Sequence, residues 1–316
     1  MHSSVKRPCG PHPWLPCALL ILSVVANGHP AAHAEHSNST FSVATYNARF
    51  LMDVFDDPYT HDEEHEPKKQ RELALLAKTI RQLNADIVAF QEVENEGTLK
   101  AFSVEHLPGM GYRQVGVLAT NSLRGQNLGI LSRHPILSIT GHRHRPLALP
   151  DDPRRWHFAR DLMHVRLRVA ESHELHLFVV HLKSKHDSEG DAESADWRLA
   201  EAIAVRRVMA ETMATDPDGW YLLVGDMNDL PLSLPLQTLR GSRDALPLID
   251  LHRHLPASQR VTYLWGRYRS TIDYILASPA LAVRSVPQSA RVLTDKSMLR
   301  GSDHAPVAAE FSFKLP

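Results

Sequence analysis

The sequence predicts an α/β protein in which two β-sheets pack against each other and helices lie outside them. Short apolar segments recur along the chain, whereas only residues 68–83 and about 195–214 show long helical periodicity. With 43% apolar and 22% charged residues, the 316-residue chain has the composition of a globular protein with a sizeable core. No Gly/Ser-rich linker divides the chain, so we predict a single domain spanning residues 35–316.

Each predicted element follows from a local pattern. Residues 41–47 alternate apolar and polar side chains, residues 86–91 form a strand around a continuous apolar run, and Pro135 ends a strand at 125–132. Residues 53–67 are polar and acidic, and we expect a solvated loop there, with metal binding by 61–66 as the less favoured alternative. Further strands are predicted at 175–180, 221–224, 261–263, 271–276 and 307–313.

The first residues have the pattern of a secretory signal peptide. A basic pair at Lys6 and Arg7 precedes an apolar stretch at 14–26, and Ala32-His33-Ala34 fits a cleavage site after Ala34. The apolar stretch is too short for a membrane span and contains Pro16, which disfavours an anchor. We therefore predict export of residues 35–316 to the periplasm or the medium, without a membrane anchor. Both cysteines precede the cleavage site, so the exported chain has no disulfides.

The net charge of the chain argues against tight binding of long duplex nucleic acid by electrostatic attraction alone. Its 35 basic and 36 acidic residues give a formal charge of −1, so it does not grip long duplexes by charge alone. Residues 142–168, however, are rich in arginine around Trp156 and Phe158. This mixture suits base stacking and backbone contacts, and a surface hairpin explains it equally well. The loop at 263–269 is a second candidate wall of a cleft, although we favour aromatic packing against a sheet for it.

Polar side chains follow the predicted strands at the points where those strands end. Asn47, Glu92, His181 and Asp226 each close a short apolar run, and Asn228 follows two residues after Asp226. Later in the chain, Asp273 interrupts an apolar run, and an Asp303-His304 pair precedes the last strand. An isolated buried carboxylate is unfavourable without a partner, so Asp273 indicates a charge pair. Strand ends that open into one cleft would bring these groups together.

This set of side chains has the composition needed to hydrolyse a phosphate ester. Mg²⁺ prefers oxygen ligands and needs few carboxylates, and Glu92 and Asp303, with Asn47 as a neutral ligand, fit this role. Asp226 or His304 would take the proton of the attacking water. We expect Asp273 to orient His304. The predicted donors to the phosphoryl oxygens are His181, Asn228, Arg160 and Lys183.

The motifs that contain these residues resemble the endonuclease/exonuclease/phosphatase superfamily, which includes pancreatic-type deoxyribonuclease, abasic-site endonucleases and bacterial sphingomyelinases. The matching segments, in the order of the family, are TYNARF, AFQEVEN, VVHLKSK, VGDMND, TIDYIL and GSDHAPV, which lie between Phe41 and Phe311. The resemblance implies a four-layer α/β/β/α sandwich of two mixed sheets and a magnesium-dependent phosphoesterase, with Mn²⁺ or Ca²⁺ as alternative metals.

By position, the resemblance assigns Asn47, Glu92 and Asp303 to the metal and makes Asp273 and His304 the Asp-His pair. It assigns His181, Asp226 and Asn228 to phosphate binding and water activation, and it leaves open which group is the base. Abasic-site nucleases carry a second acidic residue two places after the asparagine, where this chain has Arg49.

Three functions follow, and the first is the main prediction. HLKSK and GQNLGILSRHPI look most like exported bacterial nucleases, so we predict a monomeric nuclease that cleaves DNA or RNA. The alternative is a phosphoesterase for a phospholipid headgroup or a sugar or inositol phosphate, although no apolar hairpin for membrane contact stands out in the sequence. A binding protein without catalysis is disfavoured, because the metal carboxylates and the Asp-His pair are all present.

Overall fold

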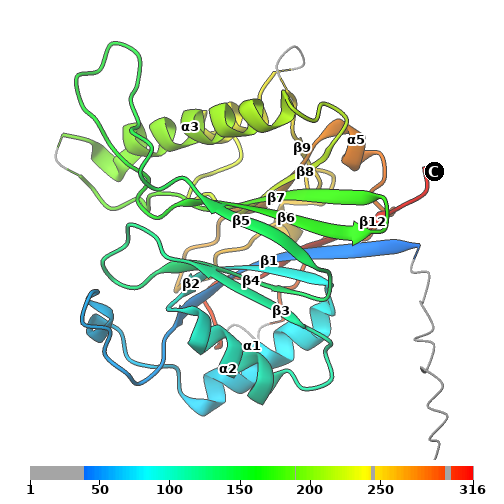
Figure 1. Cartoon of the computed structure of the whole chain (residues 1–316). Coiled ribbons are helices and arrows are strands. Elements are labelled where there is room, and N and C mark those ends of the chain that lie inside the picture. Colours follow the sequence, from blue (N-terminus) through cyan, green and yellow to red (C-terminus); the bar gives the residue numbers. More distant parts are fainter. Residues whose placement is uncertain (1–38, 189, 243–245, 296–299, 316) are drawn as a thin grey trace, which may run out of the picture. The chain divides into compact units, whose positions relative to one another are not determined.

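The computed structural model describes residues 39–315 apart from 189, 243–245 and 296–299, so the predicted signal peptide lies outside the described residues. The described chain forms two six-stranded mixed sheets (Figure 1). The first has the order β11-β12-β1-β2-β4-β3 and the second β5-β6-β7-β8-β10-β9. Helices cover the outer face of each sheet, which confirms the predicted α/β/β/α sandwich.

The first sheet and its helices come mainly from the N-terminal half of the described chain. Its strands are β1 (Thr40–Leu51), β2 (Ile87–Val93), β3 (Gln114–Leu118), β4 (Asn127–Ser132), β11 (Arg291–Val292) and β12 (Val307–Ser312). Helices α1 (Gln70–Leu83) and α2 (Glu96–His106) pack on its outer face. Helix α1 matches the predicted helix at 68–83, whereas α2 and β3 had no predicted counterpart.

The second sheet contains β5 (Ile136–Gly141), β6 (Leu162–Ala170), β7 (His173–His181), β8 (Trp220–Asp226), β9 (Ile249–Asp250) and β10 (Asp273–Ala277). Helices α3 (Ala195–Met213) and α4 (Leu234–Arg240) pack on its outer face, and α5 (Pro279–Ala282) follows β10. Short 3₁₀ turns lie at Asp62–Glu64, Ala192–Ser194 and Ala257–Gln259. The strand predicted at 261–263 is wrong, because Tyr263 makes only isolated bridges to Ser270 and His304.

The alternation of side chains along the strands explains the layers. In β2, Ile87 and Ala89 point into the core between the sheets, whereas Val88 and Phe90 pack under the helices. Both faces are therefore apolar, which is why this strand reads as one continuous apolar run.

Parallel pairing brings the carboxyl ends of four strands to one edge of the sandwich. Strand β1 runs parallel to β2, and β7 runs parallel to β8 with His181 opposite Asp226. Gly225 lies in β8 with φ 134°, and a Cβ there would meet the Val180 carbonyl oxygen at 2.0 Å. Glycine is therefore required for the close approach of β7 and β8 just before the polar edge.

Candidate active site

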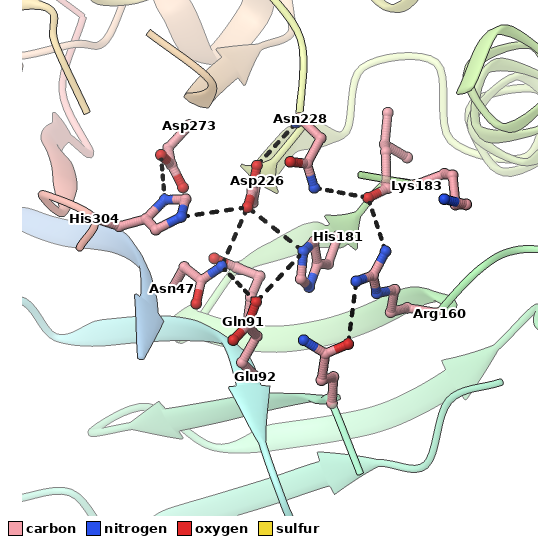
Figure 2. A network of polar contacts seen from close by, with 12 residues as sticks. Asn47, Gln91, Glu92, Arg160, His181, Lys183, Asp226, Asn228, Asp273 and His304 are labelled. Carbon is pink, nitrogen blue, oxygen red and sulfur yellow. Dashed lines mark hydrogen bonds and ion pairs between the residues drawn. The ribbon is translucent and has the colours of Figure 1, made fainter. Parts of the chain in front are cut away.

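The strand ends gather seven of the sequence-predicted residues into one polar network (Figure 2). Asn47 and Glu92 come from β1 and β2, and His181 and Asp226 end β7 and β8. Asp273 starts β10 directly opposite Asp226 in the antiparallel pair. Asn228 follows β8 and His304 precedes β12, so the network joins the two sheets.

The Asp-His pair is formed and buried. His304 Nδ1 lies 2.9 Å from Asp273 Oδ2, and His304 Nε2 lies 3.8 Å from Asp226 Oδ2. Burial alone would lower the pKa of His304, but the charges of Asp273 and Asp226 outweigh it and raise the pKa to about 10. A pKa this high favours the protonated imidazole at neutral pH, in which Nδ1 donates to Asp273 and Nε2 faces Asp226.

Asp226 occupies the centre of the network. Its Oδ2 accepts a hydrogen bond from Asn47 Nδ2 at 3.1 Å and lies 3.5 Å from His181 Nε2. Burial, followed by the charge of Asp273, raises the pKa of Asp226 to about 7. A carboxyl group with this pKa exchanges protons near neutral pH, which is the property of a general base or acid.

His181 is a neutral donor or acceptor between the two sheets. Its Nε2 lies 3.8 Å from Glu92 Oε1, and the ring is buried. Burial, together with the positive charges of Arg160 and His304, lowers the pKa of His181 well below its ordinary value. A neutral His181 can hydrogen-bond to a phosphoryl oxygen without competing with His304 for a proton.

Backbone strain marks the side of the site that faces the first sheet. Asn47 Nδ2 donates to Glu92 Oε1 at 3.3 Å, and the Phe50 amide donates to Glu92 Oε2 at 3.2 Å. Glu92 has φ 60°, Arg49 48° and Phe50 55°, although none is glycine. Left-handed residues of this kind cost free energy and persist where the surrounding contacts fix them, which is characteristic of functional sites.

The two predicted substrate-binding cations adjoin the network at the Leu182 carbonyl. Asn228 Nδ2 donates to this oxygen at 2.9 Å, and Arg160 Nη1 donates to it at 3.3 Å. Arg160 is buried, its Nη2 donates to Gln126 Oε1 at 3.1 Å, and its Nε has no partner among the described residues. Lys183 is half-buried and follows the same carbonyl along the chain.

Comparison with known proteins identifies the family. A sequence model of the Endonuclease/Exonuclease/phosphatase family matches residues 44–304. The chain belongs to this family. Because this is a family of metal-dependent phosphoesterases and nucleases, the chain is a phosphoesterase of that general kind. No curated protein sequence matches the chain significantly.

Solved structures share the fold at low identity. The catalytic domain of human Nocturnin with bound sulfate is 19% identical, with a TM-score of 0.63 over 87% of this chain and 95% of that one. The 3′ phosphatase NExo from Neisseria, bound to a product DNA hairpin, is 22% identical, with a TM-score of 0.58 over 86% of this chain and 100% of that one. A family protein from Bacteroides thetaiotaomicron is 20% identical, with a TM-score of 0.58 over 87% and 96%. These likenesses establish the architecture.

Enzymes of this family use divalent metal ions, and the carboxylate oxygens at the site are suitable ligands for a hard cation. Glu92 and Asp303 keep 11% and 16% of their side chains exposed, whereas Asp226 and Asp273 are enclosed. Ligand atoms of Asp226, Asp273 and His304 also lie within 4.8 Å of one another. In that second group His304 already donates to Asp273, so the less enclosed carboxylates of Glu92 and Asp303 fit a hard divalent cation better.

Arg49 alters this family site where the abasic-site nucleases carry an acid. Arg49 Nε lies 3.7 Å from Asp303 Oδ2, and its guanidinium stacks 4.4 Å from the Trp265 ring centroid. The arginine therefore balances the charge of Asp303 from the solvent side and leaves fewer carboxylates for metal.

The loop at 263–269 does not pack as we expected. Trp265 and Tyr268 are 48% and 58% exposed, so the predicted packing of these aromatics on a sheet is wrong. The loop is fixed by the Leu264 amide, which donates to the Asp303 carbonyl at 2.9 Å. Its Trp265 indole thus lies against Arg49, which in turn contacts Asp303.

Several residues that support the network escaped the sequence analysis. Ser302 Oγ donates to the Asn47 carbonyl at 2.7 Å and accepts from the His304 amide at 3.0 Å. Thr262 Oγ1 accepts from the Asp273 amide at 3.1 Å. Both hydroxyls are fully buried. Their only sequence signal is proximity to the Asp-His motif and to the TIDYIL strand.

The acidic loop before α1 is partly structural. Asp62 is only 5% exposed and accepts from the Asp57 amide at 3.2 Å and from Thr60 Oγ1 at 3.0 Å. The other residues of 61–66 are half-buried or exposed, as expected for a solvated loop. Asp56 and Glu63 are exposed neighbours of Asp62, and such acidic groups are common on protein surfaces.

Proposed function

We propose that this chain is an exported, magnesium-dependent nuclease that hydrolyses phosphodiester bonds of DNA or RNA. The observation that carries the proposal is the cross-sheet network in which Asp226 lies between neutral His181 and protonated His304 and shares the contacts of Asn47 and His181 with the carboxylate of Glu92. The family places the chain among phosphoesterases, and one of its structural relatives is a phosphatase bound to a DNA product.

In this proposal Asp226 is the general base. Its raised pKa of about 7 lets it accept a proton from the attacking water at neutral pH. The backbone amide of Asn228 donates to Asp226 Oδ1 at 2.9 Å and fixes the carboxyl group, so that Oδ2 faces Asn47, His181 and His304. Asp273 acts through His304, because it holds the imidazole in one orientation and keeps it protonated.

His304, His181, Asn228, Arg160 and Lys183 would hold the phosphoryl group. Protonated His304 directs Nε2 toward the site and stabilises negative charge on a phosphoryl oxygen. Neutral His181 and the Asn228 amide add hydrogen bonds, and the two cations approach from the Leu182 side. These donors and cations stabilise the phosphoryl group as it gains negative charge during cleavage of the bond.

Asn47, Glu92 and Asp303 are the residues that would hold the cation, with Mn²⁺ or Ca²⁺ as substitutes for Mg²⁺. When bound, the cation neutralises the non-bridging oxygens that otherwise repel a nucleophile. The contact between Asn47 and Glu92 and the strained backbone at Glu92 keep the carboxylate directed at this position.

Export rests on the sequence of residues 1–34. Among the residues that the structure describes, no helix is long and apolar enough to cross a membrane. N-terminal sequencing of the protein recovered from cells and medium tests the proposal, because cleavage after Ala34 leaves Glu35 as the first residue.

The decisive experiment is a substrate panel assayed with and without Mg²⁺. We expect plasmid and single-stranded DNA or RNA to be degraded in Mg²⁺ and protected by a chelator. Hydrolysis of bis-p-nitrophenyl phosphate with every nucleic acid left intact would contradict the nuclease proposal and favour a smaller phosphoester.

A phospholipid headgroup is the second candidate substrate, because one observation favours it. Leu230, Leu232 and Leu234, which follow Asn228 along the chain, are 46%, 83% and 58% exposed. Exposed apolar side chains close to a catalytic strand end suit contact with a lipid surface, although the sequence alone had not indicated such a segment. Release of a headgroup from lipid vesicles, with no release from nucleic acid, would support this candidate.

A further inference from the structure

A cationic groove adjoins the candidate active site on the side of Arg160. It has a volume of about 730 Å³ and is lined by residues 121–124, 126, 143–144, 155–160 and 183–184 and by Trp197. Arg160 and Lys183, which border the catalytic network at Leu182, also line this groove. A substrate whose scissile phosphate lies at Asp226 can therefore extend directly into it.

The groove concentrates positive charge in a chain that is nearly neutral. Its lining includes four arginines and one lysine and no aspartate or glutamate, whereas the whole chain has a formal charge of −1. Arg143 donates to the carbonyls of Ala119 and Thr120 at 2.9 and 3.2 Å, and Arg155 donates to backbone carbonyls at 2.7 Å. Within the described part of the chain, neither guanidinium has a carboxylate in ion-pair contact.

Arg160 supplies an independent indication that an anion belongs here. Its side chain is 5% exposed, and its hydrogen bonds go to neutral acceptors, the Leu182 carbonyl and Gln126 Oε1. The Nε atom is buried and has no partner among the described residues. A buried guanidinium that lacks a bonded counterion is unfavourable until an anion binds, so the inner end of the groove is built for a phosphate.

Aromatic rings accompany the cations along the same wall. Trp197 is half-buried, its Nε1 donates to the His157 carbonyl at 2.9 Å, and Lys183 Nζ lies 5.5 Å from its ring centroid. Trp156 is held by paired backbone hydrogen bonds with Leu147 at 2.8 and 3.0 Å. Indole rings fixed among unpaired cations bind bases by stacking and backbones by charge, which requires bases that are not already paired.

We propose that this groove, which we call the arginine groove, binds the unpaired nucleotides that flank the scissile phosphate. This inference rests on the proposed function and narrows it, because it makes single-stranded nucleic acid the substrate class. Arg143 and Arg155 hold flanking phosphates, and Trp197 or Trp156 stacks a base. The cavity has the size of an ordinary ligand site, which suits one or two unpaired nucleotides.

The test compares the double variant Arg143→Gln/Arg155→Gln with the control Arg168→Gln. Arg168 belongs to the same arginine-rich segment, but it lies on β6, is exposed, pairs with Glu174 at 3.7 Å and does not line the groove. Binding of a fluorescein-labelled oligothymidylate is measured by anisotropy in chelator, so that no cleavage occurs. Hydrolysis of bis-p-nitrophenyl phosphate in Mg²⁺ reports the catalytic network alone.

We expect the double variant to bind the oligonucleotide about tenfold to a hundredfold more weakly, because two charged phosphate contacts are lost. The control should change binding about twofold or less, and neither variant should change hydrolysis of the small diester. Trp197→Ala should weaken binding about tenfold, since base stacking on an aromatic ring is lost. A duplex of the same length should compete more weakly than the single strand.

The outcomes separate this inference from the proposed function. If wild-type protein cleaves single-stranded nucleic acid and the double variant binds and cleaves it equally well, the nuclease proposal stands and the arginine groove is refuted. If the wild type cleaves only the small diester yet binds the oligonucleotide through Arg143 and Arg155, the groove is supported and the nuclease proposal fails. Equal loss of small-diester hydrolysis and oligonucleotide binding would also refute the groove, because it would indicate general damage.

Discussion

Replacement of Asp273 by asparagine should change how the stability of the protein depends on pH. Asp273 is 3% exposed, and its Oδ2 lies 2.9 Å from His304 Nδ1. Asparagine keeps the size of the side chain but removes its charge. Loss of one partner from a buried ion pair destabilises a protein by about 3–5 kcal/mol, so we expect a decrease of this order near pH 7 in the free energy of unfolding.

The direction of the pH dependence follows from the pKa of His304. In the native wild type this pKa is raised to about 10 from the ordinary value of 6.5. The pair's stabilisation is fully present below pH 6.5 and is lost as the pH rises toward 10, because the native state holds a proton that the unfolded chain has released. The slope approaches about −1.4 kcal/mol per pH unit for one proton.

In Asp273→Asn only the charge of Asp226 still opposes the effect of burial, so the pKa of His304 should fall. This negative slope between pH 7 and 8 should therefore be smaller in the variant. Groups elsewhere with raised or lowered pKa values, such as Glu201 at about 7 and Lys68 at about 8, contribute equally to both proteins. The difference between the two proteins thus reports His304 together with Asp226, whose pKa the charge of Asp273 also raises.

The assay is urea unfolding of both proteins in chelator at several pH values between 7 and 8, followed by circular dichroism. Asp273→Ala serves as a second variant in case the asparagine retains a strong hydrogen bond. Parallel pH profiles for the wild type and both variants would refute a protonated His304 in the native state, and with it the assigned role of Asp273.

Three further substitutions test the metal side, the strand edge and a buried ion pair. Glu92→Ala should abolish magnesium-dependent hydrolysis with an unchanged circular dichroism spectrum, and full activity would remove Glu92 from the metal site. Gly225→Ala should destabilise the protein by at least about 3 kcal/mol, measured by urea unfolding, because its Cβ would lie 2.0 Å from the Val180 oxygen. Arg198→Met should lower unfolding free energy by about 3 kcal/mol, since it breaks the 3.0 Å contact with buried Asp229. Addition of Asp229→Leu to Arg198→Met should restore part of that loss.

The strands and the polar residues at their ends could be predicted from the sequence, because both are determined by residues that are close together in the chain. The apolar run in β2 and the polar residue after it predicted both the strand and the position of Glu92. Helix α2 was missed because its buried face contains only Leu99 and Phe102 as large apolar residues. The signal that was present is Asn95, whose side chain caps the helix by accepting from the Thr98 amide at 2.9 Å.

Features that depend on contacts between distant segments of the chain could not be predicted from the sequence. The left-handed backbone of Glu92 is set by contacts from Asn47 and Phe50, which lie more than forty residues away in the chain. Trp265 and Tyr268 are of residue types that are usually buried, yet both are exposed. Arg49 of β1 stacks on the Trp265 ring. Tertiary contacts overrode local preference in both cases.

The placement of catalytic groups on two separate sheets links activity to the packing between the sheets. Asn47 and Glu92 belong to the first sheet, and His181, Asp226 and Asp273 to the second. Within the polar network, hydrogen bonds cross between the sheets from Asn47 Nδ2 to Asp226 Oδ2 at 3.1 Å and from His304 Nδ1 to Asp273 Oδ2 at 2.9 Å. Because the apolar core between the sheets sets their separation, a change of volume there moves metal ligands relative to the general base. Substitutions far from the polar edge should therefore lower turnover before they unfold the chain.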